Sequence, residues 1–238
     1  MNARPTFVLL HGLLCDADTW ADFIGPLSRR GHVLAADLSD IDSLPDAARN
    51  VLAATAGPLI VAGHSMGGRI ALEMARQAPE RCSALVLMNT GYQGLGEGET
   101  EKRMALVRAA RAGGVQAIAD DWLDGMIAPR TRVDSALMAR MRAMVLRSTP
   151  DSFAGQIQAL IGRPDATELL GRIACPVLLM SGTEDRWSPL ERHADMASRM
   201  PDAALEAIAQ AGHMAPFEAP GACLSAITGW LARRGLAA

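Results

Sequence analysis

Residues 58–76 constrain the fold more than any other part of the chain. They read PLIVA, then GHSMGG, then RIALEMAR. The first run has the length and composition of a buried strand, and the last has helical spacing. A serine at such a junction lies on a sharp turn, because Gly63 and Gly67 let the strand and the helix approach closely. The hydroxyl of Ser65 is then exposed, and the amides that begin the helix point toward any negative charge beside it.

The bulk composition is that of a globular protein with a large core. Half of the 238 residues are hydrophobic, and the formal net charge is −3. This balance argues against a nucleic-acid-binding protein, which carries an excess of Lys and Arg. No apolar run approaches the roughly 18 residues of a membrane span, and no secretory signal pattern opens the chain. We therefore expect neither a membrane nor a nucleic acid among its partners.

The cysteines and histidines indicate no metal chemistry. The four cysteines are scattered and form no C-x-x-C motif, and the five histidines lack zinc-type spacing to them. We expect unpaired thiols, a reducing cytoplasmic location and no metal site. The cysteines are Cys15, Cys82, Cys175 and Cys223.

Strands and helices alternate through residues 1–90. Apolar runs typical of strands occur at 6–10, 32–37, 58–62 and 84–90, with helical spacing between most of them. This rhythm predicts a parallel sheet with helices on both faces.

The rhythm stops at residues 91–171 and then returns. The helical stretches expected in this segment are Glu99–Ala112, Val115–Met126, Asp134–Arg147, Asp151–Ile161 and Asp165–Leu170. Strand character reappears at 176–180 and 203–209, and a last helix is expected at 221–233. We therefore expect an α/β core formed by residues 1–90 and 172–238, with a helical cap at 91–171 inserted into it.

A serine hydroxyl needs a base to become a nucleophile, and the base needs a group that orients it. Asp185 follows the strand near 177–181, and His213 follows the last strand. Both lie at carboxyl ends of strands, where α/β sheets place their sites. We predict His213 as the general base and Asp185 as its orienter. The side chain of Glu184 is expected to point away.

Two backbone amides should bind the oxygen that becomes negative during attack on a carbonyl. Met66, directly after the serine, supplies one amide. The loop after the first strand supplies the other, and Leu13 is the predicted donor.

Four motifs resemble those of the α/β-hydrolase-fold serine hydrolases. They are LLHGLL (9–14), GHSMGG (63–68), SGTEDRWSP (181–189) and AGHMAPFEAP (211–220). The resemblance implies a Ser65–Asp185–His213 triad, a helical cap and no cofactor. Two features differ from that family. The chain has no room for the usual antiparallel strand pair at the start, so about six mainly parallel strands are expected. The loop LSDIDS (38–43) also lacks the family's glycine-rich pattern.

The other histidines and Cys15 have structural interpretations. His64 is expected to pack inside the turn, and His11 to support the loop that holds Leu13. His32 and His193 are expected at the surface. Cys15 is expected to be a neutral, packed thiol, because no second base is available to activate it.

Several side chains are candidates for substrate contact. Trp187 and Phe217 either line the acyl pocket or pack. Met126 and the other cap methionines either fill the cap core or form an apolar floor for substrate. Arg163 is a candidate for holding a substrate carboxylate. The arginines at 130, 132, 140, 142 and 147 form either a solvated face or a dock for an acidic carrier protein.

These residues predict a hydrolase that cleaves a small ester or a related acyl compound through an acyl-enzyme. Hydrolysis of a C–C bond, a lactone, an amide or an acyl-carrier methyl ester would use the same residues. An alternative of another class is a ligand-binding module on the same fold. The oligomeric state is left open.

Overall fold

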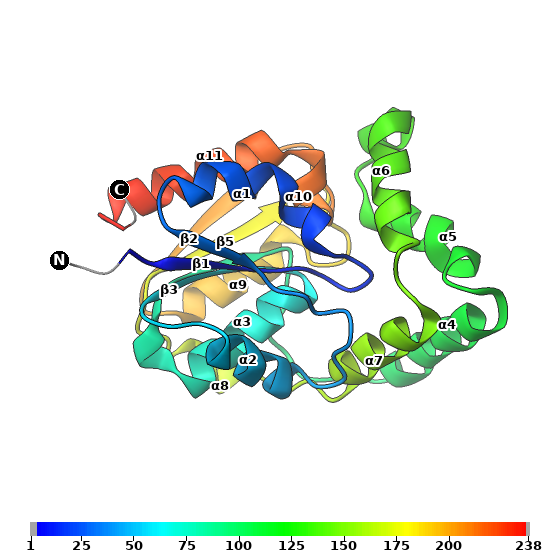
Figure 1. The fold of residues 1–238 in the computed structure, drawn as a ribbon, viewed down its shortest axis with the longest axis horizontal. Helices are drawn as coiled ribbons and strands as arrows, with labels where there is room; N and C mark the ends of the chain where they lie inside the picture. The colour runs from blue at the N-terminus through cyan, green and yellow to red at the C-terminus, as the bar shows by residue number, and fades with distance from the viewer. Residues whose placement is uncertain (1–3, 237–238) are drawn as a thin grey trace.

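The computed structural model describes residues 4–236 and has a central sheet with helices on both faces (Figure 1). The strands are β1 (Thr6–Leu10), β2 (His32–Ala35), β3 (Leu59–His64), β4 (Cys82–Met88), β5 (Val177–Gly182) and β6 (Ala203–Ile208). They form one six-stranded sheet in the order β2-β1-β3-β4-β5-β6, and every neighbouring pair is parallel. The predicted parallel sheet is confirmed.

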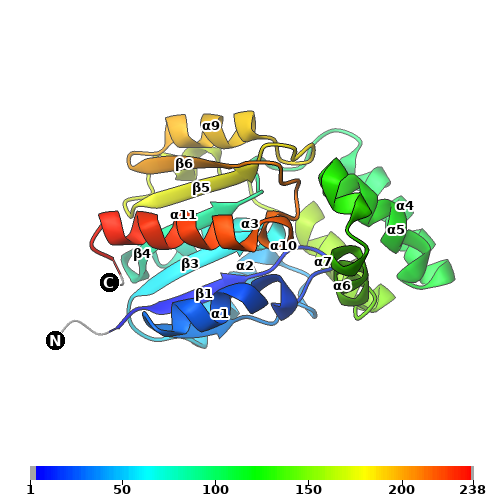
Figure 2. The ribbon, with the colours of Figure 1, turned by 90° about the horizontal axis from the view of Figure 1, so that it is seen from above.

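The core helices cover both faces of this sheet. They are α1 (Ala21–Ser28), α2 (Leu44–Ala53), α3 (Met66–Gln77), α9 (Leu190–Arg199), α10 (Ala215–Glu218) and α11 (Pro220–Arg233). α1 and α11 lie on one face, and α2, α3 and α9 on the other (Figures 1 and 2). Neither α9 nor α10 was predicted from the sequence.

The alternation of side chains along each strand builds two hydrophobic cores. In β1, Val8 and Leu10 face the cluster under α2 and α3, while Phe7 and Leu9 face the cluster under α1 and α11. Each such fully buried side chain contributes roughly 1.5–3 kcal/mol relative to exposure. The two cores therefore hold the carboxyl ends of the strands in fixed positions.

Between β4 and β5 the chain forms only helices. They are α4 (Glu99–Gly113), α5 (Gln116–Met126), α6 (Ser135–Val145), α7 (Pro150–Ile161) and α8 (Thr167–Leu170). α4 to α7 lie at the end of the sheet toward which the strands point (Figure 2). Their buried side chains form a third cluster, which includes Leu14 and Phe217 of the core loops.

Candidate active site

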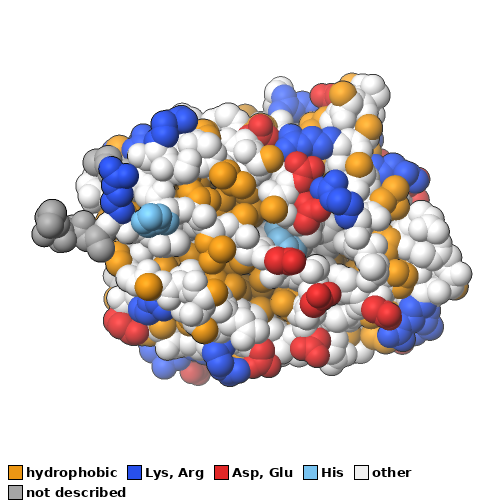
Figure 3. All heavy atoms as spheres, viewed as in Figure 1, with side chains coloured by type: hydrophobic (Ala, Val, Ile, Leu, Met, Phe, Trp, Pro, Cys, Tyr) orange, Lys and Arg blue, Asp and Glu red, His pale blue; other side chains and the backbone are white. Residues whose placement is uncertain are grey.

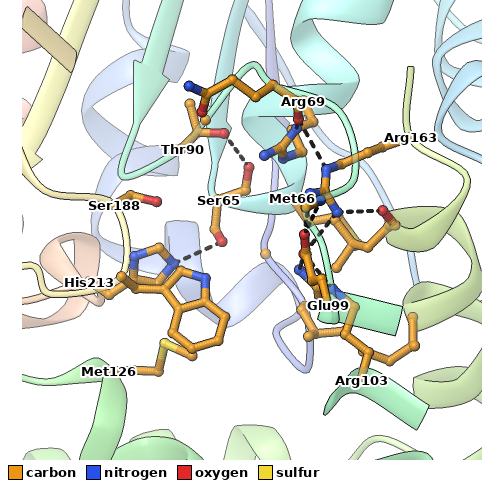
Figure 4. A pocket seen from close by; sticks show the side chains of 18 of the residues that line it. Ser65, Met66, Arg69, Thr90, Glu99, Arg103, Met126, Arg163, Ser188 and His213 are labelled. Carbon is orange, nitrogen blue, oxygen red and sulfur yellow. Dashed lines mark hydrogen bonds and ion pairs between the residues drawn. The ribbon is translucent and has the colours of Figure 1, made fainter. Parts of the chain in front are cut away.

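Ser65 lies at the junction of β3 and α3 in a backbone conformation that residues other than glycine rarely adopt. Its φ is 54° and its ψ is −112°. A Cβ on Gly63 would lie 2.3 Å from the Gly67 oxygen, and a Cβ on Gly67 would lie 2.1 Å from the Leu10 oxygen. Thr90 Oγ1 donates to the Ser65 carbonyl at 2.7 Å (Figure 4). The glycines therefore permit the turn, and the neighbouring strand holds it.

Ser65, His213 and Asp185 form a continuous hydrogen-bonded chain. His213 Nε2 lies 2.8 Å from Ser65 Oγ, and His213 Nδ1 lies 2.9 Å from Asp185 Oδ2. The histidine and the aspartate are 3% and 4% exposed. The three residues come from turns after β3, β5 and β6, so the shared direction of the strands brings distant positions together.

The carboxylate of Asp185 is held in its ionised form. Asn89 Nδ2 donates to Oδ2, and the amides of Trp187 and Ser188 donate to Oδ1, each at 2.8 Å. Burial alone would raise the pKa of Asp185, but the charge of His213 and these donors outweigh it and place the pKa below its usual range. An ionised Asp185 accepts the Nδ1 proton of His213, which leaves Nε2 free to accept the serine proton.

The amides of Leu13 and Met66 border the same space. Met66 is the first residue of α3, so its amide has no partner within the helix. In residues 4–236, neither amide donates a hydrogen bond to the protein. The next residue, Leu14, has a φ of 57° and donates its amide to Gln156 Oε1 at 3.0 Å, which fixes the loop.

Two of the remaining histidines lie where the sequence predicted. His11 Nε2 accepts from the Leu38 amide at 3.1 Å and supports the Leu13 loop. His64 Nε2 lies 2.8 Å from the His213 carbonyl, and burial lowers the pKa of His64 to about 3. His64 is therefore neutral, and its ring contacts the loop that carries His213.

The expected surface position of His193 was wrong. Its side chain is fully buried on α9, and its Nε2 accepts from the Thr90 amide at 3.1 Å. Burial lowers the pKa of His193 to about 4. The prediction failed because α9, which turns this residue toward the sheet, was not recognised. His32 is exposed as expected.

Glu218 was not predicted to have a role, although it lies within the last motif. Its Oε1 accepts from the Gly212 amide at 2.9 Å. Its Oε2 accepts from the Ala128 amide at 2.8 Å and from Thr131 Oγ1 at 2.7 Å. The amide of His213 donates to the carbonyl of Met126 at 2.7 Å. The loop that carries the base is thus tied to the helical segment by Glu218 and by a backbone bond.

A cavity of about 730 Å³ opens onto Ser65 and His213. Met126, which is 5% exposed, and Trp187, which is 52% exposed, both line it. Phe217 does not. It is 3% exposed and packs in the third hydrophobic cluster.

Cys15 also lines this cavity without becoming a nucleophile. Burial raises the pKa of its thiol to about 12, so the thiol is neutral.

Arg163 lines the cavity, but its donors are already used. A guanidinium has five N–H donors. Two bind Glu99, at 2.9 and 2.5 Å, and the others bind the carbonyls of Gln93, Leu160 and Gly94 at 2.8 to 3.1 Å. The geometry therefore does not support the expected contact between Arg163 and a substrate carboxylate.

The basic stretch of the helical segment is paired with acids. The ion pairs are Arg132–Asp124, Arg140–Asp18, Arg142–Asp120 and Arg147–Asp16. Blue and red side chains lie side by side where α6 approaches the core (Figure 3). Arg130 donates to Gln210 and to the Glu218 carbonyl. Arg130, Arg140 and Arg147 join the segment to the core, and Arg132 and Arg142 pair within it. This arrangement does not favour a dock for an acidic carrier.

Within residues 4–236, no group of three or more His, Cys, Asp or Glu side chains is placed to hold a metal ion. None of the described helices combines the length and the apolar character that crossing a bilayer requires.

The fold and the site define the class of protein. The profile of the alpha/beta hydrolase family matches residues 7–226, and the chain belongs to that family. The resemblance of the four motifs is thereby confirmed.

Individual relatives refine the class. Pimeloyl-[acyl-carrier protein] methyl ester esterase of Chromobacterium violaceum is 31% identical over 91% of this chain and 90% of its own. A 2-hydroxy-6-oxononadienedioate/2-hydroxy-6-oxononatrienedioate hydrolase of Pseudomonas sp is 30% identical, but the match spans 66% of this chain and only 56% of that enzyme. A thermophilic esterase of Thermogutta terrifontis superposes with a TM-score of 0.87 and 26% identity, covering 98% of this chain and 91% of its own. The chain is a hydrolase.

Proposed function

We propose that this hydrolase cleaves a small ester, with Ser65 as nucleophile, His213 as general base and Asp185 as orienter. The observation that carries the proposal is the hydrogen-bonded chain from Asp185 Oδ2 through His213 to Ser65 Oγ, which ends in an open cavity. The strained backbone at Ser65 supports it, since such strain concentrates at functional sites.

The reaction follows from this geometry. His213 Nε2 takes the Ser65 Oγ proton as Oγ attacks the substrate carbonyl. The amides of Leu13 and Met66 bind the oxyanion, and Asp185 stabilises the imidazolium. The imidazolium then protonates the leaving alcohol, and the acyl group stays on Ser65. Water loses a proton to His213, attacks the acyl-enzyme and releases the acid, and Ser65 regains its proton.

Residues 91–171 serve as the substrate-shaping cap in this proposal. Their helices supply Leu106, Trp122 and Met126 to the cavity wall. The esterases among the relatives support an ester as the substrate. The similarity to the Pseudomonas hydrolase supports C–C bond hydrolysis as the alternative reaction. The paired arginines of the cap favour a small-molecule substrate over one attached to an acidic carrier protein.

We also propose a cytoplasmic location. All four cysteines are free, although three of them are buried, and this supports a reducing compartment.

The test is turnover of p-nitrophenyl esters by the wild type, Ser65→Ala and a control, Ser198→Ala, on the exposed side of α9. Ser65→Ala should lower kcat by about 10³-fold or more, because the acyl-enzyme cannot form. Ser198→Ala should match the wild type. Undiminished turnover by a folded Ser65→Ala variant would contradict the mechanism. Faster turnover of a C–C substrate than of any ester would favour the alternative reaction.

A further inference from the structure

The cavity wall carries a surplus of positive charge that the chain as a whole lacks. The net charge of the chain is −3. Six cationic side chains nevertheless line the cavity, against two carboxylates, Glu99 and Asp165. The cations are Arg69, Lys102, Arg103, Arg163, Arg186 and Arg192.

The two carboxylates are committed to other groups. Glu99 binds both Arg103, at 2.7 Å, and Arg163, at 2.5 Å. Burial alone would raise the pKa of Glu99, but hydrogen bonds from Arg163, the Gly96 amide and Arg103 lower it to about 2. Asp165 accepts from the amides of Gly94 and Thr167, both at 2.7 Å. Neither carboxylate forms an ion pair with Arg69.

Arg69 is placed where a substrate would lie. It is the fourth residue of α3, and Ser65 is the residue directly before that helix, so both lie at the helix end that borders the cavity. Its side chain is partly buried and lies between Ser65 and the Arg163–Glu99 pair on the cavity wall (Figure 4).

Most of the hydrogen-bonding capacity of Arg69 is unused. One N–H donates to the Gln93 carbonyl at 2.8 Å. Its other donors have no protein partner in the described part of the chain. In Arg163, by contrast, all five N–H donors are bound to protein groups.

The surroundings of Arg69 favour an anion. Burial lowers the pKa of Arg69 to about 9; the neighbouring charge of Arg163 acts in the same direction, and the charge of Glu99 opposes them in part. Arg69 is still a cation at neutral pH, but it is poorly solvated and lies beside another cation. A carboxylate would relieve both penalties, whereas a neutral acyl chain would leave the charge desolvated and unpaired.

We propose that Arg69 binds a carboxylate carried by the acyl group, so that the enzyme prefers half-esters of short dicarboxylic acids to neutral esters of equal length. Arg69 in the first turn of α3 and Ser65 directly before that helix line the same cavity, so a short chain joins the bound carboxylate to the scissile carbonyl. This inference rests on the proposed ester hydrolysis at Ser65 and names the substrate class of that site.

The test compares kcat/KM for mono-p-nitrophenyl glutarate and p-nitrophenyl pentanoate, which differ in the terminal carboxylate. The wild type should favour the glutarate by at least about tenfold. Arg69→Met should lower this ratio by about 10- to 100-fold, mainly through KM for the anionic ester, since charge-assisted hydrogen bonds are strong. Arg69→Lys should restore part of the ratio.

Arg49→Met is the matched control, because it removes one exposed arginine of α2 that does not line the cavity. The glutarate/pentanoate ratio of this variant should equal that of the wild type. An equal loss of ratio in Arg49→Met would mean that net charge alone sets the preference, and this would overturn the role of Arg69.

Inhibition of wild-type pentanoate-ester turnover gives a second measurement that needs no folded Arg69 variant. Glutarate should compete at concentrations at least about tenfold lower than its neutral diamide. Equal inhibition by the two compounds, or a wild-type ratio at or below one with pentanoate ester still hydrolysed, would overturn the proposal and leave ester hydrolysis standing. Undiminished turnover by Ser65→Ala would instead remove the proposed function, and this inference with it.

Discussion

The two walls of the cavity are built by different means. On the core wall, loops that directly follow strands hold Ser65, His213 and Asp185 through hydrogen bonds of 2.8–2.9 Å. On the cap wall, apolar side chains of the helices pack on one another in the third hydrophobic cluster, and Glu99, Lys102 and Arg103 of α4 add charged groups. Glu218, outside the cavity lining, joins the loop that carries His213 to Ala128 and Thr131 of the helical segment. Under the proposed function, this difference assigns the choice of reaction to the core and the size of the accepted substrate mainly to the cap.

Arginines sharpen the same comparison. The cap arginines Arg140, Arg142 and Arg147 are paired with aspartates. Arg69 on the core wall lines the cavity and has N–H donors that bind no protein group in the described residues. Charge at the joint between cap and core is thus balanced within the protein by pairs such as Arg140–Asp18 and Arg147–Asp16, whereas Arg69 keeps donors that the proposed carboxylate would bind.

The largest expected effect is a pH dependence of the free energy of unfolding that arises from buried histidines. It arises in the core, because residues 91–171 contain no histidine. Burial lowers the pKa of His64 to about 3 and that of His193 to about 4, both from 6.5. Below pH 6.5, His64 and His193 are protonated in the unfolded chain but remain neutral in the folded chain. The free energy of unfolding is therefore highest above pH 6.5 and falls as the pH decreases. Each buried histidine contributes up to about 1.4 kcal/mol per pH unit to this fall.

Urea unfolding between pH 7.5 and 5 measures this slope. His193→Gln should reduce the slope, and His32→Gln, at an exposed position, should leave it unchanged. A wild-type free energy of unfolding that stays flat over this range would show that the buried histidines do not couple to folding.

An intermediate effect is expected at the joint between the walls. Glu218→Gln keeps the shape but places an NH₂ group against amide or hydroxyl donors, so the loop that carries His213 should loosen. We expect kcat to fall by about 10- to 100-fold, equally for short and long esters, with KM little changed. Thr131→Val removes only one of the three donors and should have a smaller effect. A rise in KM without a fall in kcat would contradict the positioning role.

The smallest effect is expected on the cap wall. Met126→Ala should widen the cavity and raise kcat/KM for long acyl chains relative to short ones by a few fold. Met104→Ala is the control, since Met104 packs in the same cluster but does not line the cavity. An identical chain-length profile in Met126→Ala and Met104→Ala would mean that Met126 serves only the packing of the cap.

What could be predicted from the sequence follows from how local each signal is. The strands and the Ser65, Asp185 and His213 positions depend on short patterns at strand ends, and the structure brings these three residues together. The burial of His193 depends on how α9 packs, and the partners of Glu218 lie 6 to 90 positions away. In the sequence Arg69 is an ordinary polar position of a helix, because its unused donors become visible only when Glu99 is seen bound to other arginines.

The most direct test of the central claim is the intact mass of the protein after incubation with a fluorophosphonate, followed by peptide mapping. The wild type should gain the mass of one adduct at Ser65, and folded Ser65→Ala should gain none, because only a serine activated by His213 attacks the reagent. An adduct on Ser65→Ala, or no adduct on the wild type, would contradict Ser65 as the nucleophile of this hydrolase.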